Sequence, residues 1–270
     1  MNKQQIAKIL RIVLLAGIPA AALLQEIAVL ISYDKGTHYF VANAPLPVLA
    51  NVFTTVLFVV AVLCALIAPK PLATSSPFGK QIWIAIPAAL GFAIGGIFLL
   101  IEFFVNRAIL SFVSAVVLLL SALHLLLSET DRKLTPLGYF PPLACALLVC
   151  ILYFDASMEM NAPLKVAVQC ALLPLMLYFT TELRYLLGRE LPRLYSALAL
   201  GSLAASSLCV LTVPVASIAG SLKNAYCFIA AIAVIGINAT VALRQWRYLQ
   251  APAPDTTSPD ENETKETDAQ

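Results

Sequence analysis

The sequence carries little charge for its length. Of its 270 residues, 12% are Asp, Glu, Lys or Arg and 60% are hydrophobic, with a mean hydropathy of +0.88. A soluble domain has about 25% charged and 45–50% apolar residues. The deficit excludes an ordinary soluble domain, and a net charge of only +2 gives no reason to expect a nucleic-acid partner.

Histidine is nearly absent, and the familiar catalytic and metal-binding motifs are missing. The two histidines, His38 and His124, fall at different predicted depths, which argues against a haem held by two histidines. The six cysteines lie in apolar stretches without a Cys-x-x-Cys pair, so we expect them to act as small apolar residues. There is no phosphate-binding Gly-Lys-Ser/Thr loop, no His-Glu-x-x-His and no Gly-x-Ser-x-Gly. We therefore expect no cofactor, no metal site and no catalytic residues.

Most of the sequence consists of long apolar runs. A helix needs about 20 mostly apolar residues to span the hydrocarbon of a bilayer. Eight stretches meet this length, namely 10–32, 47–68, 81–104, 108–127, 136–154, 163–182, 195–216 and 224–243. Because the connections are short, residues 1–250 are predicted to form one all-α polytopic membrane domain, a bundle of about eight transmembrane helices.

Lysine and arginine predict the orientation of this bundle. Lys35, Arg107, Lys165 and Lys223 fall on one side of the predicted membrane, and the other thirteen of the 17 basic residues fall on the opposite side. Basic residues concentrate in cytoplasmic loops, so both termini are predicted to be cytoplasmic, in the cytoplasmic membrane of a bacterium. Alternatively, the basic N-terminal residues and the apolar run after them are a cleaved signal peptide, which would leave seven helices.

Two short motifs suggest an internal duplication. "NAPLPV" at residues 43–48 and "NAPLKV" at residues 161–166 each open an apolar stretch, which suggests parallel four-helix halves at 1–130 and 131–250. Asn and Pro are also favoured independently at helix starts, so convergence is the alternative. Residues 251–270 are acidic and almost free of bulky apolar side chains, which predicts a disordered cytoplasmic tail.

Glu26 is the most unusual residue within the predicted spans. It follows Gln25 in the apolar run "ALLQEIAVLI", in the outer half of the first span. A charged group there costs at least ~2.5 kcal/mol, so Glu26 should face the bundle interior or a wet cavity. Asn51, Thr54 and Gln169 share this outer half. We predict that the five residues form a ligand- or ion-binding cavity with Glu26 at its floor. A structural hydrogen bond, or a helix shifted so that Glu26 nears the surface, are the alternatives.

Other charged residues are predicted near the membrane surfaces. Glu102 and Arg107 flank a very short outer turn and are expected to form an interfacial ion pair. Arg184, Arg189 and Arg193 form a basic cluster at the inner end of the sixth stretch. The cluster is typical of an anchor at an anionic leaflet, and a gate or a docking surface for a cytoplasmic partner is the alternative.

Two classes of function fit these features. The first is a transporter-like protein, or the membrane subunit of a permease, with a polar outer-half cavity around Glu26. The second is a non-transporting scaffold or sensor that binds a partner through its basic inner face or its acidic tail. An intramembrane enzyme comes third, since no nucleophile–base or metal pair is visible. The expected partners are the lipid bilayer, a small molecule or ion, and a partner subunit.

Overall fold

The protein is almost entirely helical over the residues that its computed structural model describes, which are 3–67, 81–128, 132–189, 191–222 and 224–250. The helices are α1 (Lys3–Ser32), α2 (Pro45–Ile67), α3 (Ile82–Asn106), α4 (Ile109–Ser128), the 3-10 helix η1 (Arg132–Tyr139), α5 (Phe140–Phe154), α6 (Pro163–Leu186), α7 (Pro192–Ser206), α8 (Thr212–Ile218) and α9 (Ala225–Gln250). Two short antiparallel strands, β1 (Tyr33–Asp34) and β2 (Tyr39–Phe40), form a hairpin between α1 and α2. The predicted acidic tail at 251–270 lies outside the described residues.

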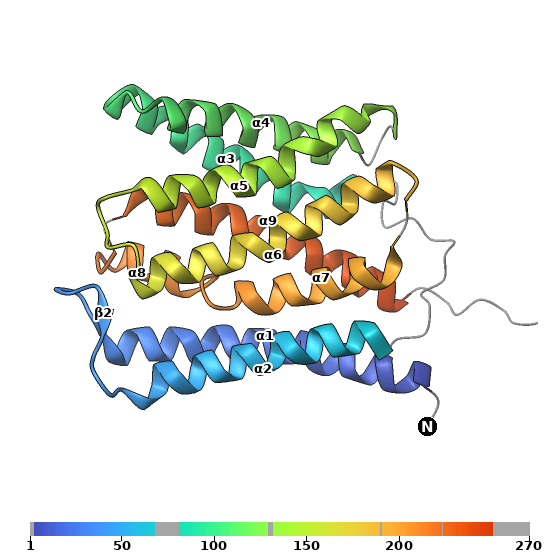
Figure 1. The fold of residues 1–270 in the computed structure, drawn as a ribbon, viewed down its shortest axis with the longest axis horizontal. Coiled ribbons are helices and arrows are strands. Elements are labelled where there is room, and N and C mark those ends of the chain that lie inside the picture. The colour runs from blue at the N-terminus through green and yellow to red at the C-terminus, as the bar shows by residue number, and fades with distance from the viewer. Residues whose placement is uncertain (1–2, 68–80, 129–131, 190, 223, 251–270) are drawn as a thin grey trace, which may run out of the picture.

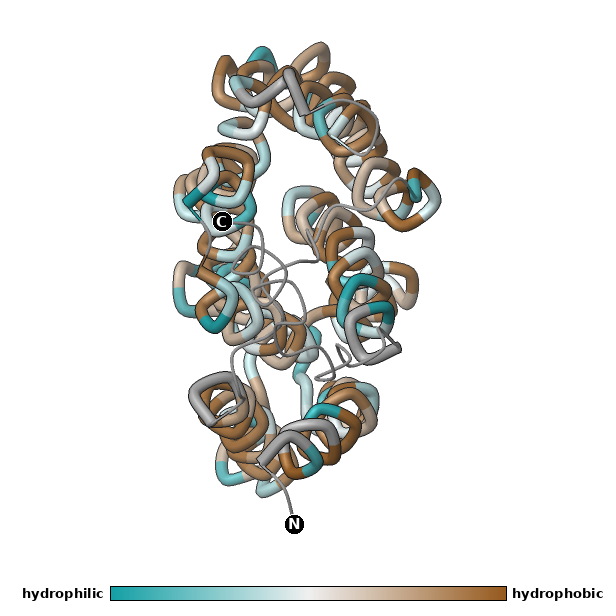
Figure 2. Tube along the Cα trace, turned by 90° about the vertical axis from the view of Figure 1, so that its right-hand side faces the viewer, coloured by the Kyte–Doolittle hydropathy of each residue, from teal (hydrophilic) through white to brown (hydrophobic). Residues whose placement is uncertain are grey.

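Seven helical segments are long and apolar enough to cross a membrane. They are Ile9–Ser32, Pro45–Cys64, Ile82–Asn106, Ile109–Ser128, Pro136–Phe154, Pro163–Leu186 and Ala225–Arg247. Each corresponds to one of the predicted spans, and Figure 2 shows hydrophobic residues along most of their length. The chain is therefore an all-α, multi-pass membrane protein.

The seventh predicted span, 195–216, is interrupted, so a count of eight continuous spans is not confirmed. In place of one helix over 195–216, α7 ends at Ser206 and the short α8 begins at Thr212. Pro214 contributes to this break, because it has no N–H to donate to the carbonyl of Val210, four residues earlier, and its ring crowds that carbonyl. In the intervening turn, Leu208 N–H donates to the carbonyl of Ala205 at 3.2 Å, a tighter pattern than an α-helix makes.

The helices lie roughly parallel in an elongated bundle (Figure 1). The α1–α2 pair forms one edge, α3 and α4 form the other, and α6, α7 and α9 lie between them. α1 begins and α9 ends at the same end of the bundle, so α7 and α8 together carry the chain across once. Which side of the membrane that end faces stays a prediction.

The predicted internal repeat is not confirmed by the packing. The α1–α2 and α5–α6 pairs are alike, since each packs closely and each is joined through an Asp turn. Asp34 Oδ1 accepts a hydrogen bond from Gly36 N–H at 2.9 Å, and Asp155 Oδ1 accepts one from Ser157 N–H at 3.0 Å. The next helices differ, however, because α6 packs on α7 whereas α2 and α3 scarcely touch.

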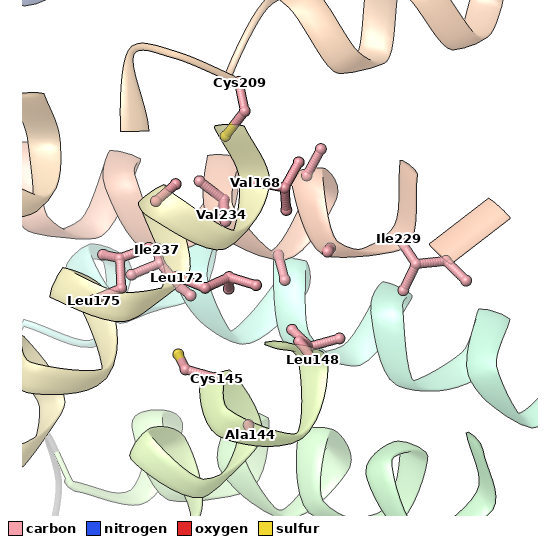
Figure 3. Packing of buried hydrophobic residues seen from close by; sticks show 14 of the residues in the cluster. Ala144, Cys145, Leu148, Val168, Leu172, Leu175, Cys209, Ile229, Val234 and Ile237 are labelled. Carbon is pink, nitrogen blue, oxygen red and sulfur yellow. The ribbon is translucent and has the colours of Figure 1, made fainter. Parts of the chain in front are cut away.

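The main core lies where α5, α6 and α9 meet (Figure 3). Leu148, Leu172 and Val234 are buried there, and Cys145 and Cys209 pack among them as apolar side chains. Close packing of this kind holds membrane helices together without a hydrophobic drive from water. The core fixes α6 and α7 as the rigid wall against which the α1–α2 pair lies.

Candidate functional site

A cavity of about 410 Å³ lies between the α1–α2 pair and the α6–α7 pair. Its volume falls in the range of small-molecule sites, roughly 300–1,000 Å³. α1 and α2 supply most of its polar groups, and α6 and the start of the α7–α8 turn supply an apolar wall. None of the described residues that line it carries a charge.

The polar wall is built by three residues of α2 and one of α1. Gln25 Nε2 donates to Asn51 Oδ1 at 2.9 Å, which joins the two helices across the cavity wall. Thr55 Oγ1 donates to the backbone carbonyl of Asn51 at 2.8 Å. Thr54 is only 3% exposed, and its hydroxyl has no hydrogen-bond partner among the residues that the structure describes. Thr54 Oγ1 is fully buried and therefore not open to the cavity, and its unpaired hydroxyl is a cost to stability.

The opposite wall is apolar and ends at the interrupted helix. Val166, Ala167 and Cys170 line it from α6, and Ala205 and Leu208 line it from the end of α7 and the turn that follows. Backbone that leaves a regular helix within a membrane is tolerated where protein or a cavity surrounds it. The break in the seventh predicted span therefore lies at the cavity.

The hairpin after α1 and the loop before α6 meet at the mouth of the cavity. Phe40 and Asn161 line this end, and the neighbouring Tyr39 hydroxyl donates to Glu159 Oε2 at 2.5 Å. The hydrogen bond to the Glu159 carboxylate raises the pKa of Tyr39, because it favours the neutral phenol. The hairpin after α1 is thereby tied to the loop before α6.

The structure brings together three of the five residues predicted for this cavity. Gln25, Asn51 and Thr54 line it, whereas Glu26 and Gln169 do not. Successive helical residues point about 100° apart, so a helix that turns Gln25 toward Asn51 turns Glu26 away. Both carboxylate oxygens of Glu26 are buried, with no hydrogen-bond partner among the described residues. The cavity is thus centred on Gln25 and Asn51, not on Glu26.

The predicted interfacial pair of Glu102 and Arg107 is replaced by a local contact. Glu102 accepts a hydrogen bond from the side-chain amide of Asn106, and the described residues show no ion pair with Arg107. Arg107 has a left-handed backbone, with φ of 56°, and its N–H donates to Phe103 O at 2.7 Å. Arg107 therefore terminates α3 through its backbone conformation.

The basic cluster surrounds the turn between α6 and α7. Arg184, Arg189 and Arg193 are all exposed. Gly188 takes the left-handed conformation with φ of 73°, and Arg189 N–H donates to the carbonyl of Arg184 at 2.9 Å. The turn thus presents three cations at the end of the bundle where α1 begins.

Sequence reasoning missed a buried ion pair in the other half of the bundle. Glu182 of α6 and Arg244 of α9 are 5% and 4% exposed and form a salt bridge. Arg244 Nη1 also donates to the hydroxyl of Tyr178 at 3.1 Å. The Tyr178 hydroxyl in turn lies 2.9 Å from the hydroxyl of Tyr195. Glu182 is the last residue of the predicted span 163–182, and Arg244 directly follows the predicted span 224–243. Their shared depth at the ends of two predicted spans was the available signal.

No known protein family, curated protein or solved structure matches this chain. The site must therefore be interpreted from its own geometry. Among the described residues, no group of three or more His, Cys, Asp or Glu side chains is arranged to hold a metal ion. What the cavity offers instead is a set of uncharged hydrogen-bonding groups beside an apolar wall.

Proposed function

We propose that this protein is a membrane transporter, or the membrane subunit of a permease, that binds its small-molecule substrate between the α1–α2 and α6–α7 pairs. The observation that carries the proposal is the 410 Å³ cavity with the Gln25–Asn51 hydrogen bond in its wall. A bundle selected only for stability would fill such a cavity, since voids cost stability.

The break between α7 and α8 favours a transporter over a protein that only binds its ligand. Discontinuous membrane helices often form the substrate sites of transporters, because their freed backbone groups lie within the membrane. Here Ala205 and Leu208 flank the break and line the cavity. A hinge at this position can couple occupancy of the cavity to movement of α7.

The packing of α1, α2 and α7 supports access from one side at a time. Phe58 is the last residue of α2 that lines the cavity, and Ala61 and Cys64 follow it by three and six residues. At 1.5 Å per residue these are about 4–5 Å and 9 Å beyond it. Ala61 and Cys64 are buried in one cluster with Leu14 of α1 and Leu200 of α7, so the space between these helices is filled at that end of the cavity.

The test begins with ligand-induced stabilisation of the full chain in lipid nanodiscs. A compound that binds the folded protein raises Tm in proportion to its concentration over Kd. Compounds that do so are then assayed for flux in proteoliposomes. We expect Thr55→Val to weaken binding about 3- to 10-fold, the loss of one hydrogen bond, because Thr55 is the exposed threonine of the lining. Thr180→Val is the matched control, because Thr180 is an exposed α6 residue whose hydroxyl bonds its own helix at Met176 O, as that of Thr55 does at Asn51 O.

Two results would count against transport. If no compound in a broad screen stabilises the protein or crosses the bilayer, the proposal is abandoned. If a compound binds with the expected Thr55 dependence but no flux follows, the cavity is a sensor site.

The exposed basic turn supports a second candidate, a scaffold that binds a cytoplasmic partner. Arg184, Arg189 and Arg193 project from one short connection, which gives a concentrated positive surface suited to an acidic partner. Co-purification with the triple Arg→Gln variant tests this candidate. A partner that is retained by the wild type and lost by the variant would favour it.

A further inference from the structure

The β1–β2 hairpin lies between two cavities. The first is the 410 Å³ cavity of the candidate site, which is lined mostly by membrane-crossing helices. The second, of about 380 Å³, is lined by residues 36–39 of the hairpin and 156–159 of the loop before α6. Figure 1 shows the hairpin beyond the ends of α1 and α2. A molecule that enters the first cavity from this end of the bundle therefore passes the hairpin.

Neighbouring residues of β2 face the two cavities. Side chains alternate between opposite sides of a strand, and Phe40 lines the first cavity while Tyr39 lines the second. Phe40 is partly buried against the main core, and its ring packs edge-on against that of Tyr33, with centroids 5.9 Å apart. Phe40 therefore fills the mouth of the first cavity as long as the strand stays in place.

Two contacts of Tyr39 hold the strand against the loop before α6. The Tyr39 hydroxyl lies 2.5 Å from Glu159 Oε2 and 2.5 Å from Asn161 Oδ1, and we call these three residues the latch. Both contacts are exposed to water, where a hydrogen bond within the protein is exchanged for one to water at little net cost. The latch can therefore open and close.

The backbone of the hairpin is weakly held. Its ladder has two residue pairs, and a single two-stranded hairpin is marginally stable at best in water. His38 and Asn43, on either side of β2, have φ of 61° and 64°. This conformation is strained for residues other than glycine and recurs at clamps and switch regions. The position of β2 thus depends on the packing of Phe40 and on the latch.

We infer that the hairpin is a gate to the first cavity, which Phe40 plugs and the latch holds shut. This inference rests on the proposed function and names the regulation of the same site. The substrate enters when Tyr39 releases its two partners and β2 moves away from the loop before α6. The hairpin then controls access from one end of the bundle, while the buried Ala61 and Cys64 fill the other end of the cavity.

Cys170 is a native reporter for this gate. It is exposed, lines the first cavity and lies seven residues beyond Pro163 in α6, which is about 10 Å of helix. The full chain with Cys150→Ala, which removes the other exposed cysteine, is placed in nanodiscs and treated with a charged methanethiosulfonate. Its charge keeps the reagent out of the hydrocarbon, so the rate at which Cys170 is labelled measures access through water.

We expect slow labelling of Cys170 in the parent and labelling about 3- to 10-fold faster with Tyr39→Phe, the effect of one lost hydrogen bond on the open population. Glu159→Ala should act in the same direction, and the double variant should label no faster than Tyr39→Phe alone, because both changes remove the same contact. Phe40→Ala should give the fastest labelling. Tyr153→Phe is the matched control, since Tyr153 is an exposed α5 tyrosine outside the linings of both cavities.

Other results overturn the gate or the function separately. Labelling that Tyr39→Phe and Phe40→Ala leave unchanged, whether fast or slow, shows that the hairpin does not control access, and the inference fails. If uncharged N-ethylmaleimide, which enters through lipid, also labels the variants faster, or if the buried Cys145 becomes labelled, the fold has loosened and the gate fails. If labelling follows the latch but no compound binds or crosses the bilayer, the hairpin still closes the cavity while the proposed function falls.

Discussion

Two buried threonines differ in what their hydroxyls contact. Thr240 Oγ1 accepts a hydrogen bond from Ala88 N–H at 3.0 Å, whereas Thr54 Oγ1 has no partner within the described part of the chain. Removing an unsatisfied buried group relieves a cost of about 1–3 kcal/mol, and removing a partner creates one. In the absence of ligand, we expect Thr54→Val to stabilise the protein by about 1 kcal/mol and Thr240→Val to destabilise it by a similar amount. Unfolding of both variants in mixed micelles measures this.

The two variants also show whether the Thr54 hydroxyl is unsatisfied in the folded protein. If Thr54→Val proves as destabilising as Thr240→Val, the Thr54 hydroxyl has a structural partner.

The Glu182–Arg244 pair predicts a strong asymmetry between single and double variants. Removing one member of a buried ion pair costs about 3–5 kcal/mol, because the other charge is left unpaired, whereas apolar replacement of both is often neutral. We expect Glu182→Leu to destabilise the protein by that amount, and Glu182→Leu with Arg244→Leu to recover most of the loss. The free energy of unfolding measures both.

Arg184→Leu is the control for this cycle, since Arg184 is exposed two residues from Glu182 and surface changes usually stay within about 0.5 kcal/mol. A double variant no more stable than the single one would show that the pair contributes little, and that Tyr178 or the packing around it carries the effect.

At the scale of single residues, the sequence predicts how deep a side chain lies in the membrane better than which way around the helix it points. The positions of Gln25, Asn51 and Thr54 along their spans place them in one layer, and the structure brings them together. Glu26 has the same depth, but one step around the helix turns it away from the cavity. The burial of Lys165 was also not predictable: its side chain is fully buried, and its Nζ donates to the carbonyl of Asp155 at 2.7 Å.

At the scale of the elements, α3 and α9 form one of the tightest contacts in the bundle. A Cβ at Gly236 would lie 2.3 Å from the backbone carbonyl of Pro87, which cannot move aside as a side chain can. At Gly95 the nearest atom is the flexible end of Leu118, at 3.1 Å. Gly236→Ala should therefore push the helices apart and destabilise the fold by roughly 1–3 kcal/mol or more, while Gly95→Ala should have a smaller effect.

Thermal unfolding of the two alanine variants tests this difference. A single added methyl is the same chemical change at both sites, so helix propensity cancels between them. Equal Tm values for the two variants would mean that α3 and α9 approach less closely than the structure shows.

The elements themselves were largely predictable, because length and hydropathy suffice to identify a membrane span. The exception is the segment around Ser206 and Pro214, where an apolar composition conceals a break between two helices. Hydropathy averages over such a window, whereas the break depends on one missing N–H and on serine hydroxyls that bond nearby carbonyls, as Ser207 Oγ does to Ala204 O at 2.7 Å. The sequence therefore predicts the crossing but not its interruption.

At the scale of the whole molecule, contacts between distant segments were the least predictable feature. The repeated "NAPL" motif suggested equivalent halves, and the local turns at Asp34 and Asp155 are indeed alike. The halves nevertheless pack differently, since α6 contacts α7 while α2 and α3 scarcely touch. Which helices meet is decided by side-chain shape across the interfaces, and this also decides which polar residues share a cavity.

The two termini lie on the same side of the membrane only if α7 and α8 together cross it once. The orientation of the chain therefore tests the whole fold. Because α1 begins and α9 ends at one end of the bundle, and basic residues concentrate at that end, both termini should be cytoplasmic. A fluorescent protein fused after residue 270 should fluoresce in cells, and a cysteine introduced at Gly36 should react with an impermeant maleimide from outside. A cysteine at Gly188, in the basic turn, should react only after permeabilisation. If the Gly36 site is labelled from outside but the C-terminal fusion is also external, α7 and α8 do not cross the membrane together.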